Sequence, residues 1–230
     1  MSQQASALLD DLAQDARVRL LVVRGAGASF VSGADISEFE ALRSQPEAIA
    51  RYEAISSGLF SRLRAFPRPT LARINGFCFG AGMGLAAACD LRFSAEDATF
   101  CVPAARLGIA YRPDFISWLI QIVGAARVKE ILITARRYSA QEALAMGLVH
   151  QVAPVKTFDA DFAAYVGVIA QNAPLSTIAS KKMVDEYADP TRPPDEALCK
   201  ALSQACLESA DYVEGRRAFM EKRRPDFKGQ

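Results

Sequence analysis

The segment best suited to chemistry is the glycine-rich stretch NGFCFGAGMGLAAACD, residues 75–90, which carries no charged side chain between Gly76 and Cys89. Glycine and alanine at a junction from strand to helix let a ligand approach the backbone closely. The first amides of a helix have no acceptor inside it, and the helix dipole adds positive potential at that end. We therefore predict that the free N–H groups of this first helical turn hold a substrate oxygen, as one half of an oxyanion hole.

A second loop is expected to supply the other half of this hole. Residues 32–36, SGADI, are mostly small residues after a predicted strand, with Ala34 at their centre. A second backbone amide from such a loop would complete the hole, and Ala34 is the candidate. The structural alternative is that residues 80–89 form a tightly packed core helix and that SGADI only begins the next helix.

The same glycines fit a nucleotide site poorly. Gly80, Gly82 and Gly84 give G-x-G-x-G, and Asp90 follows only six residues after the last of them. A dinucleotide fingerprint reads G-x-G-x-x-G and has its acidic residue about 20 residues further on. A P-loop needs Gly-Lys followed by Ser or Thr, which this stretch lacks. A phosphate-binding loop is therefore disfavoured.

The single histidine and the five cysteines form no recognisable metal or nucleophile motif. His150 lies in GLVHQVAP without a G-x-S-x-G motif, so a structural position near a strand end is favoured. The odd number of cysteines, without C-x-x-C spacing or a signal peptide, favours reduced thiols in the cytoplasm. We expect them to be small buried residues and predict no metal site; they are Cys78, Cys89, Cys101, Cys199 and Cys206.

Composition narrows the class of partner. The chain has 230 residues, 51% of them hydrophobic and 23% charged, and its net charge is +1. Lys and Arg are scattered except in the tail EKRRPDFKG, which argues against nucleic-acid binding. The apolar run 76–89 is shorter than the roughly 20 residues of a membrane span, and the acidic N-terminus is not a secretory signal. We expect a cytoplasmic protein with neither a membrane nor a nucleic-acid partner.

The elements that must position these residues alternate between strand and helix, followed by a helical tail. Apolar periodicity and turn signals predict this order: helix 3–14, strand 18–25, helix 37–66 broken at Pro46, strand 70–74, helix 80–89, strands 91–95 and 98–103, helices 114–123 and 125–134, helix 140–146, strand 148–153, and helices from residue 156 onward. We predict an α/β core over residues 1–170 and a C-terminal helical region over 171–230. That region either mediates oligomerisation or packs back on the core.

Local signals mark several helix ends. Ser139 and Glu142 form a capping box, and Gly147 stands where a C′ glycine belongs. Pro174 and Pro194 are placed as first-turn prolines. In the tail, one apolar stripe at helical spacing comprises Phe162, Tyr165, Val166 and Ile169.

Several segments together resemble the crotonase, or enoyl-CoA hydratase/isomerase, superfamily. They are collinear from about residue 16 onward: SGADI, PTLARINGFCFGAGMGLAAACDLRFSAEDATF, PAARLGIAY, VKEILITARRYSAQEALAMGLVHQVAP and AFMEKRRPDF. The resemblance implies a spiral of β-β-α units with C-terminal helices, assembled as a homotrimer or hexamer. It also implies an acyl-CoA substrate, with CoA as part of the substrate and no separate cofactor.

Site residues follow from the resemblance by motif. Ala34 and Ala81 match the backbone donors that hold the thioester oxygen as an enolate develops. Phe219 and Lys222, in AFMEK, match residues that reach the CoA of a neighbouring subunit. The remaining substrate-binding positions implied are Ser32, Gly33, Asp35, Ile36, Gly80, Gly82, Gly84 and Ala104.

The sequence departs from the family pattern at both usual catalytic carboxylates. Gly84 stands where a typical hydratase has one glutamate, and Ala104 stands where it has the other. Hydration needs a base to activate water and an acid to protonate the α-carbon, and each such group typically contributes about 10²–10⁴-fold. The usual hydration route is therefore in doubt, whereas thioester enolate chemistry is not.

Three functions remain open. In the first, Tyr111 and Asp114 in LGIAYRPDF act as substitute acid/base groups, although a gapless alignment puts Arg112 at the position of related carboxylates. In the second, the protein is an acyl-CoA decarboxylase. Loss of CO₂ makes the enolate without a base, so this reaction requires only the oxyanion hole and a donor that orients the carboxylate. RLGIAY and the tail SADYVEGRRAFMEKRRPDF resemble methylmalonyl-CoA decarboxylase, which however keeps a glutamate at the Gly84 position. In the third, the protein binds CoA without catalysis.

Structural interpretations of these residues also stand. Tyr111 could be a rim aromatic without a role, and Arg112 and Asp114 could be an exposed loop pair in which Asp114 caps the next helix. Glu38 could point to the acyl pocket, but a solvent-facing position is favoured.

The N-terminus is a second departure. The family normally begins with a strand pair and an Asn-Arg-Pro turn before the helix that here starts near Gln3. Either the start is truncated or misassigned, or the strand pair has been lost. We expect weakened binding of the adenosine end of CoA and an exposed sheet edge.

Overall fold

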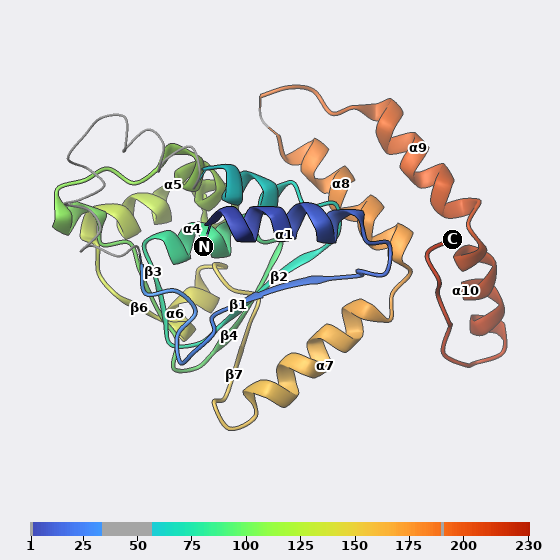
Figure 1. The fold of residues 1–230 in the computed structure, drawn as a ribbon, viewed down its shortest axis with the longest axis horizontal. Helices are drawn as coiled ribbons and strands as arrows, with labels where there is room; N and C mark the ends of the chain where they lie inside the picture. Colours follow the sequence, from blue (N-terminus) through green and yellow to red (C-terminus); the bar gives the residue numbers. More distant parts are fainter. Residues whose placement is uncertain (1, 34–56, 190) are drawn as a thin grey trace. The chain divides into compact units, whose positions relative to one another are not determined.

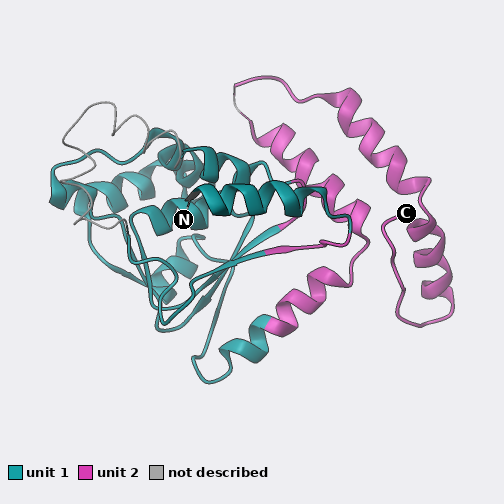
Figure 2. Ribbon diagram, viewed as in Figure 1, with its two compact units in different colours: residues 1–16, 22–66, 70–162 teal, residues 17–21, 67–69, 163–230 magenta. Residues whose placement is uncertain are grey.

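The computed structural model describes residues 2–33, 57–189 and 191–230 (Figure 1). The chain divides into two compact units, which Figure 2 colours separately. Unit 1 comprises residues 1–16, 22–66 and 70–162, and unit 2 comprises residues 17–21, 67–69 and 163–230. The helices are α1 (Ser2–Gln14), α4 (Ala81–Ala88), η1 (Ala104–Leu107), α5 (Pro113–Thr134), α6 (Ala140–Ala145), α7 (Phe158–Ala170), α8 (Pro174–Ala188), α9 (Glu196–Leu207) and α10 (Ala210–Met220). The strands are β1 (Leu21–Arg24), β2 (Thr70–Ile74), β3 (Phe77–Phe79), β4 (Leu91–Ala95), β5 (Thr99–Cys101), β6 (Tyr138–Ser139) and β7 (Gln151–Ala153).

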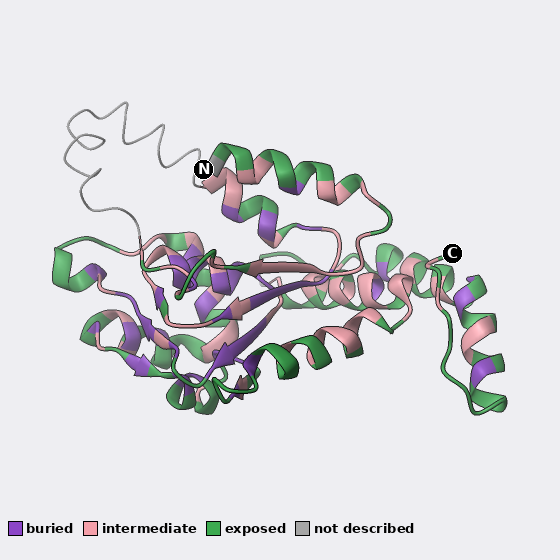
Figure 3. Ribbon diagram, turned by 60° about the horizontal axis from the view of Figure 1, so that its bottom comes forward, coloured by how far each residue is buried: buried purple, intermediate pink, exposed green. Residues whose placement is uncertain are grey.

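The strands form two sheets. One has the order β1-β2-β4-β7, in which β2 pairs in parallel with β4, and β4 with β7. The other has the order β3-β5-β6, with β3 parallel to β5 and β5 antiparallel to β6. The inner strands β2 and β4 are largely buried, as the purple ribbon in Figure 3 shows, and they carry the centre of the core.

The order of the elements follows a spiral. Two successive units, β2-β3-α4 and β4-β5-η1-α5, each contribute their first strand to the four-stranded sheet and their second strand to the three-stranded sheet. Helix α4 packs against α5 and β3, so consecutive units contact one another. This arrangement agrees with the spiral of β-β-α units predicted above.

Most elements with strong local signals form where the sequence predicts them. Strand β2, helix α4 and strand β4 match the predicted 70–74, 80–89 and 91–95. Gly124 has non-helical angles, φ 78° and ψ 158°, and divides α5 at the predicted boundary between two helices. The capping box is confirmed, because Ser139 accepts the Glu142 amide while the Glu142 carboxylate accepts the Ser139 amide. Gly147 has φ 78°, as expected of a C′ glycine.

Two points need correction, and one prediction lies largely outside the described residues. Strands β3 and β6 were not expected, because a two- or three-residue strand beside glycines carries no alternating pattern. Strand β3 forms through partners distant in sequence: it pairs with β5, and Cys78 bridges to Val31. Pro174 does lie in the first turn of α8, but Pro194 does not lie in a helix, because Asp195 is the N-cap of α9. Most of the predicted helix 37–66 lies outside the described residues, of which 57–64 are helical.

The α-helices of unit 2 are held by caps and by a buried carboxylate. Ser209 caps α10 by accepting the Tyr212 amide at 3.0 Å. Asp211, buried at the start of α10, accepts the amides of Lys228 and Gly229 at 2.7 and 2.8 Å. This carboxylate therefore fixes the last residues of the chain against the helix. Among the helices described in either unit, none combines the length and apolarity needed to cross a membrane.

Candidate active site

Helix α4 begins with an amide that points out of the helix. Its N-cap is Gly80, whose φ of 51° and ψ of −110° suit glycine and not residues with a side chain. The Gly80 carbonyl accepts the Met83 amide at 3.0 Å. In the described part of the chain, no hydrogen bond has the Ala81 amide as its donor, as expected for the first residue of a helix. No described residue therefore competes with a ligand for this predicted donor, and the helix dipole adds positive potential at this end.

The segment that leads to Ala34 runs beside this helix start. Val31 donates its amide to Phe77 at 2.9 Å and accepts the Phe79 amide at 2.8 Å. A Cβ atom placed on Gly82 would lie 2.8 Å from the Cβ of Val31, so this approach requires glycine at position 82. A Cβ atom on Gly80 would lie 3.9 Å from the Cα of Gly33. The two glycine loops therefore meet at the N-terminus of α4.

Part of the predicted site lies outside the described residues: Ala34, Asp35, Ile36 and the more distant Glu38. Of its neighbours, Ser32 is exposed, and Gly33 has φ 121°, a backbone conformation that favours glycine.

An aromatic ring from another helix occupies the space where a side chain at position 84 would lie. Gly84 is buried in α4, and a Cβ atom placed on it would lie 2.4 Å from both Cδ2 and Cε2 of Phe115 and 2.6 Å from Cζ. Phe115 belongs to α5 and is 2% exposed. Phe115 could not be identified from the sequence, because no local signal shows that its ring reaches a helix 31 positions earlier in the chain.

Tyr111 is joined to the same helix start. Its hydroxyl donates to the Gly80 carbonyl oxygen at 2.8 Å, and its ring centroid lies 5.4 Å from that of Phe115. Burial raises the pKa of the Tyr111 phenol well above its ordinary value. The phenol is therefore neutral at physiological pH, with its O–H directed at the backbone of α4. If Tyr111 lies at the rim of the site, it also makes this hydrogen bond to the backbone at the start of α4.

Arg112 and Asp114 form a close ion pair. Nη2 and Nε of Arg112 lie 2.6 and 3.1 Å from the two carboxylate oxygens of Asp114, and Nη2 also donates to Ser57 Oγ at 2.7 Å. Burial acts to raise the pKa of Asp114, but the hydrogen bonds and charge of Arg112 outweigh it, so the pKa lies below its ordinary value. Asp114 is held as a carboxylate beside a cation.

The pair differs in two respects from the exposed loop pair considered above. The side chains of Arg112 and Asp114 are 29% and 31% exposed, so both are more than half buried. The N-cap of α5 is Arg112, with Pro113 at the first helical position, so Asp114 does not cap the helix. It lies in the first turn and accepts the Phe115 amide at 3.0 Å. Proline is favoured at the first helical position, so the residue before it is the N-cap.

Ala104, the second position that the sequence predicts to lack a carboxylate, begins η1 and is 8% exposed. Its carbonyl accepts the Ile109 amide at 3.1 Å and closes the turn that leads to Tyr111. Gly84 and Ala104 therefore contribute backbone and packing contacts but no titratable group. The titratable groups that the sequence predicts for the site are Tyr111 and Asp114.

Other polar residues singled out from the sequence serve the fold. The Asp90 carboxylate accepts the amide and hydroxyl of Thr70 at 2.7 and 3.0 Å, which ties the start of β2 to the residue before β4. His150 lies near a strand end as predicted, although β7 begins one residue after it and the predicted strand 148–153 included it; its Nδ1 accepts the Arg92 amide at 3.1 Å. Burial is the main cause that lowers the pKa of His150, and the charge of Arg92 lowers it further. Within the described ranges, no three His, Cys, Asp or Glu side chains are grouped so as to bind a metal ion.

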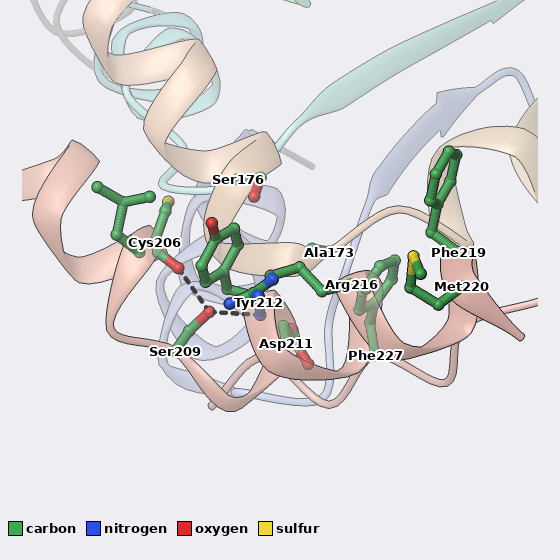
Figure 4. Close-up of a pocket in the computed structure, with 12 residues that line it drawn as sticks. Ala173, Ser176, Cys206, Ser209, Asp211, Tyr212, Arg216, Phe219, Met220 and Phe227 are labelled. Carbon is green, nitrogen blue, oxygen red and sulfur yellow. Dashed lines mark hydrogen bonds between the residues drawn. The ribbon is translucent and has the colours of Figure 1, made fainter.

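Phe219 and Lys222 belong to unit 2 and are described within it. Phe219 is 82% exposed on α10, at the edge of an open cavity of about 680 Å³ (Figure 4). Lys222 follows the C-cap of α10 with φ 53°, a left-handed conformation usually taken by glycine. The cavity was not predicted from the sequence, because helices α8 to α10 and the tail residue Phe227 form it only when packed.

Comparisons with known proteins agree on one family. The family model described as enoyl-CoA hydratase/isomerase matches residues 1–230. A probable enoyl-CoA hydratase of Bacillus subtilis is 33% identical over 234 residues, covering 99% of this chain and 88% of the relative. The 2,3-dehydroadipyl-CoA hydratase of Escherichia coli is 30% identical over 223 residues, covering 96% of this chain and 86% of the relative. The crystal structure of an enoyl-CoA hydratase/carnithine racemase from Magnetospirillum magneticum is similar with a TM-score of 0.94 at 33% identity, covering 100% of this chain and 86% of that one.

Proposed function

The chain belongs to the enoyl-CoA hydratase/isomerase family of acyl-CoA-processing enzymes, and we propose that it binds an acyl-CoA by the thioester oxygen and stabilises the enolate. The likeness to solved structures confirms the predicted crotonase fold. The observation that carries the proposal is the Ala81 amide, which starts α4 without an acceptor in the described chain and lies where two glycine loops meet.

In the proposed complex, the thioester oxygen accepts the Ala81 N–H, and Ala34 supplies the second donor. As the α-carbon gives up a proton or a carboxyl group, negative charge moves to that oxygen. Preorganised amides and a helix N-terminus stabilise this charge without having to reorient, and loss of one such donor typically costs about 10²–10³-fold in kcat. Tyr111 contributes by holding the Gly80 carbonyl, and thereby the first turn of α4, in place.

The first candidate reaction is hydration or isomerisation with substitute acid/base groups. It requires Tyr111 or Asp114 to move a proton. Both are poorly suited in the observed geometry, because the Tyr111 pKa is raised and Asp114 is paired with Arg112. A base with a lowered pKa takes up a proton weakly near neutral pH.

The second candidate is decarboxylation of a malonyl-type thioester. The Arg112–Asp114 pairing favours it, together with the absence of carboxylates at positions 84 and 104. Breaking the bond between the α-carbon and the carboxylate releases CO₂ and leaves the electron pair on the enolate, which then takes a proton from water. The reaction thus needs the oxyanion hole but no base. Binding of CoA thioesters without turnover is the remaining alternative.

We also propose that the protein self-associates as a homotrimer or hexamer and that Phe219 and Lys222 contact CoA bound to a neighbouring subunit. Phe219 and Met220 are 82% and 80% exposed, and a neighbouring copy would cover such large apolar side chains. Support for CoA contact is the charge of Lys222, which suits a phosphate, and its unusual backbone conformation.

A panel of CoA thioesters tests the proposed function. Turnover of crotonyl-CoA supports the first candidate, and CO₂ release from malonyl- or methylmalonyl-CoA supports the second. Thermal stabilisation by CoA thioesters without turnover supports the binding protein. If neither CoA nor any thioester stabilises the protein or is turned over, the assignment to acyl-CoA chemistry is wrong.

A further inference from the structure

The Phe115 ring lies on the face of α4 that leads to the proposed oxyanion hole. Gly84 follows Ala81 by three residues, so the two share one face of the helix. Bonds from Cα to Cβ tilt toward the N-terminus of a helix, which places the direction of a side chain at 84 toward the Ala81 end. The ring atoms occupy this space, because Cδ2 and Cε2 are 2.4 Å from the position of such a Cβ.

The ring has little freedom to move aside. Its centroid lies 4.6 Å from that of Phe60 in an edge-on contact, and 5.5 Å from that of Trp118. The Arg112 guanidinium lies over the ring at 4.7 Å, and Asp114 and Ser57 hold the guanidinium in turn. A buried ring packed on several sides stays in one rotamer. The Phe115 ring therefore forms a fixed boundary next to the first turn of α4.

We propose that Phe115 sets the size of the acyl group that this site accepts, by closing the space beside Gly84. The inference rests on the proposed function, because it requires the thioester oxygen to bind at Ala81. An acyl chain leaving a carbonyl at Ala81 along this face of the helix meets the ring after a few carbons. Short acyl groups fit within the boundary, and longer ones displace the ring at the cost of its packing.

Binding of two saturated thioesters tests the proposal without depending on the reaction. Dissociation constants of butyryl-CoA and octanoyl-CoA are measured by titration calorimetry for the wild type, Phe115→Leu and Phe115→Ala. Phe93→Leu is the matched control, since Phe93 is equally buried but packs on Phe158 and Phe162. We expect the wild type to prefer butyryl-CoA and the Phe115 variants to shift the ratio by about tenfold or more toward octanoyl-CoA.

The possible results distinguish a failure of the proposed size limit from a failure of the proposed acyl-CoA function. If both thioesters bind the wild type but the ratio is the same in folded Phe115 variants, the size limit is wrong and the acyl-CoA function stands. A wild type that prefers octanoyl-CoA overturns the size limit as well. If neither thioester nor CoA binds the wild type, both the function and the inference fail.

A stability measurement checks the steric contact itself, without ligand. Gly84→Ala is expected to lower the melting temperature by about 5 °C, and to lower it less in the Phe115→Leu background, which lacks Cε2 and Cζ. Gly167→Ala is the control in a helix with open space, where the nearest atom to the new Cβ is 3.9 Å away. It should not lower the melting temperature, because alanine is the better helix former. Equal effects of Gly84→Ala in both backgrounds contradict the contact on which the proposal rests.

Discussion

The Tyr111 hydroxyl donates a hydrogen bond to the Gly80 carbonyl oxygen at 2.8 Å, which joins the segment before α5 to the residue that begins α4. Gly80 precedes Ala81, so this bond holds the backbone from which the proposed oxyanion donor projects. The positioning role that we propose for Tyr111 does not require it to exchange a proton.

Tyr111→Phe is therefore expected to keep the packing of the ring but to lose this hydrogen bond. We expect a loss of about 1 kcal/mol in the free energy of unfolding, as for a typical hydrogen bond. We also expect kcat to fall with little change in KM. Tyr187→Phe is the control, since Tyr187 is 66% exposed. The ratio of kcat between wild type and Tyr111→Phe is then measured against pH. A ratio that falls to one at high pH, where the wild-type phenol loses its proton, would instead support acid/base catalysis by Tyr111.

Ala81→Pro removes the proposed N–H donor at a position where proline is compatible with a helix. Turnover of the active thioester is expected to fall by about 10²–10³-fold while the protein remains folded by circular dichroism. Ala81→Gly keeps the amide and should retain most of the activity. Full activity in a folded Ala81→Pro variant would rule out the oxyanion assignment.

Asp114→Asn leaves Arg112 without its carboxylate and is expected to destabilise the protein by about 1–2 kcal/mol at pH 7. The folded-state pKa of Asp114 lies below its unfolded value, so the unfolded state binds more protons in the acidic range and stability rises with pH. The stability difference between wild type and variant should therefore be full above about pH 5 and shrink as the pH falls through the folded pKa. Denaturant unfolding from pH 3 to pH 7 measures it, and a pH-independent difference would contradict the ion pair. Loss of crotonyl-CoA turnover in a folded variant at pH 7 would instead favour Asp114 as an acid/base group.

Lys222→Gly separates a binding role from a structural one. Lysine with φ 53° is unfavourable, and glycine is the usual residue after a helix C-terminus. We expect stability to change by less than about 1 kcal/mol and the affinity for CoA to fall, because the ammonium group is lost. Lys228→Gly, which removes a lysine from the same tail, is the control for charge. Equal affinity for CoA in wild type and Lys222→Gly would remove Lys222 from the site.

Gly84→Glu alone is expected to misfold or lose stability, because Phe115 occupies the space. Combined with Phe115→Ala and Ala104→Glu, it restores room and both carboxylates. We expect this triple variant to gain crotonyl-CoA hydration of at least about tenfold over the wild type, since each acid/base group contributes about 10²–10⁴-fold in natural enzymes. Absorbance loss of the enoyl thioester measures the gain, and Ala104→Glu by itself is the control. No gain in a folded triple variant would show that more than the missing carboxylates separates this site from a hydratase.

Much of the fold could be predicted because its signals are local. The capping box of Ser139 and Glu142, the break at Gly124 and the helix that begins at Ala81 depend on residues within one or two helical turns. The short strands β3 and β6 could not be predicted in this way, since pairing with distant segments is what forms them. The family motifs identified the crotonase fold because they are collinear over most of the chain.

By itself, the sequence determined the class of the protein and predicted two positions, 84 and 104, at which the usual carboxylates are missing. Only the tertiary structure decided what fills the space beside Gly84 and which partners the nearby polar side chains have. It put the Phe115 ring against Gly84, the Tyr111 hydroxyl on Gly80 and the Arg112 guanidinium on Asp114 and Ser57. Contacts such as the first two join residues about thirty positions apart, and which side chain fills a space follows from the packing of α4 against α5. A sequence pattern reports on neighbours along the chain, so it can show that a group is missing but not what packs where it would have been.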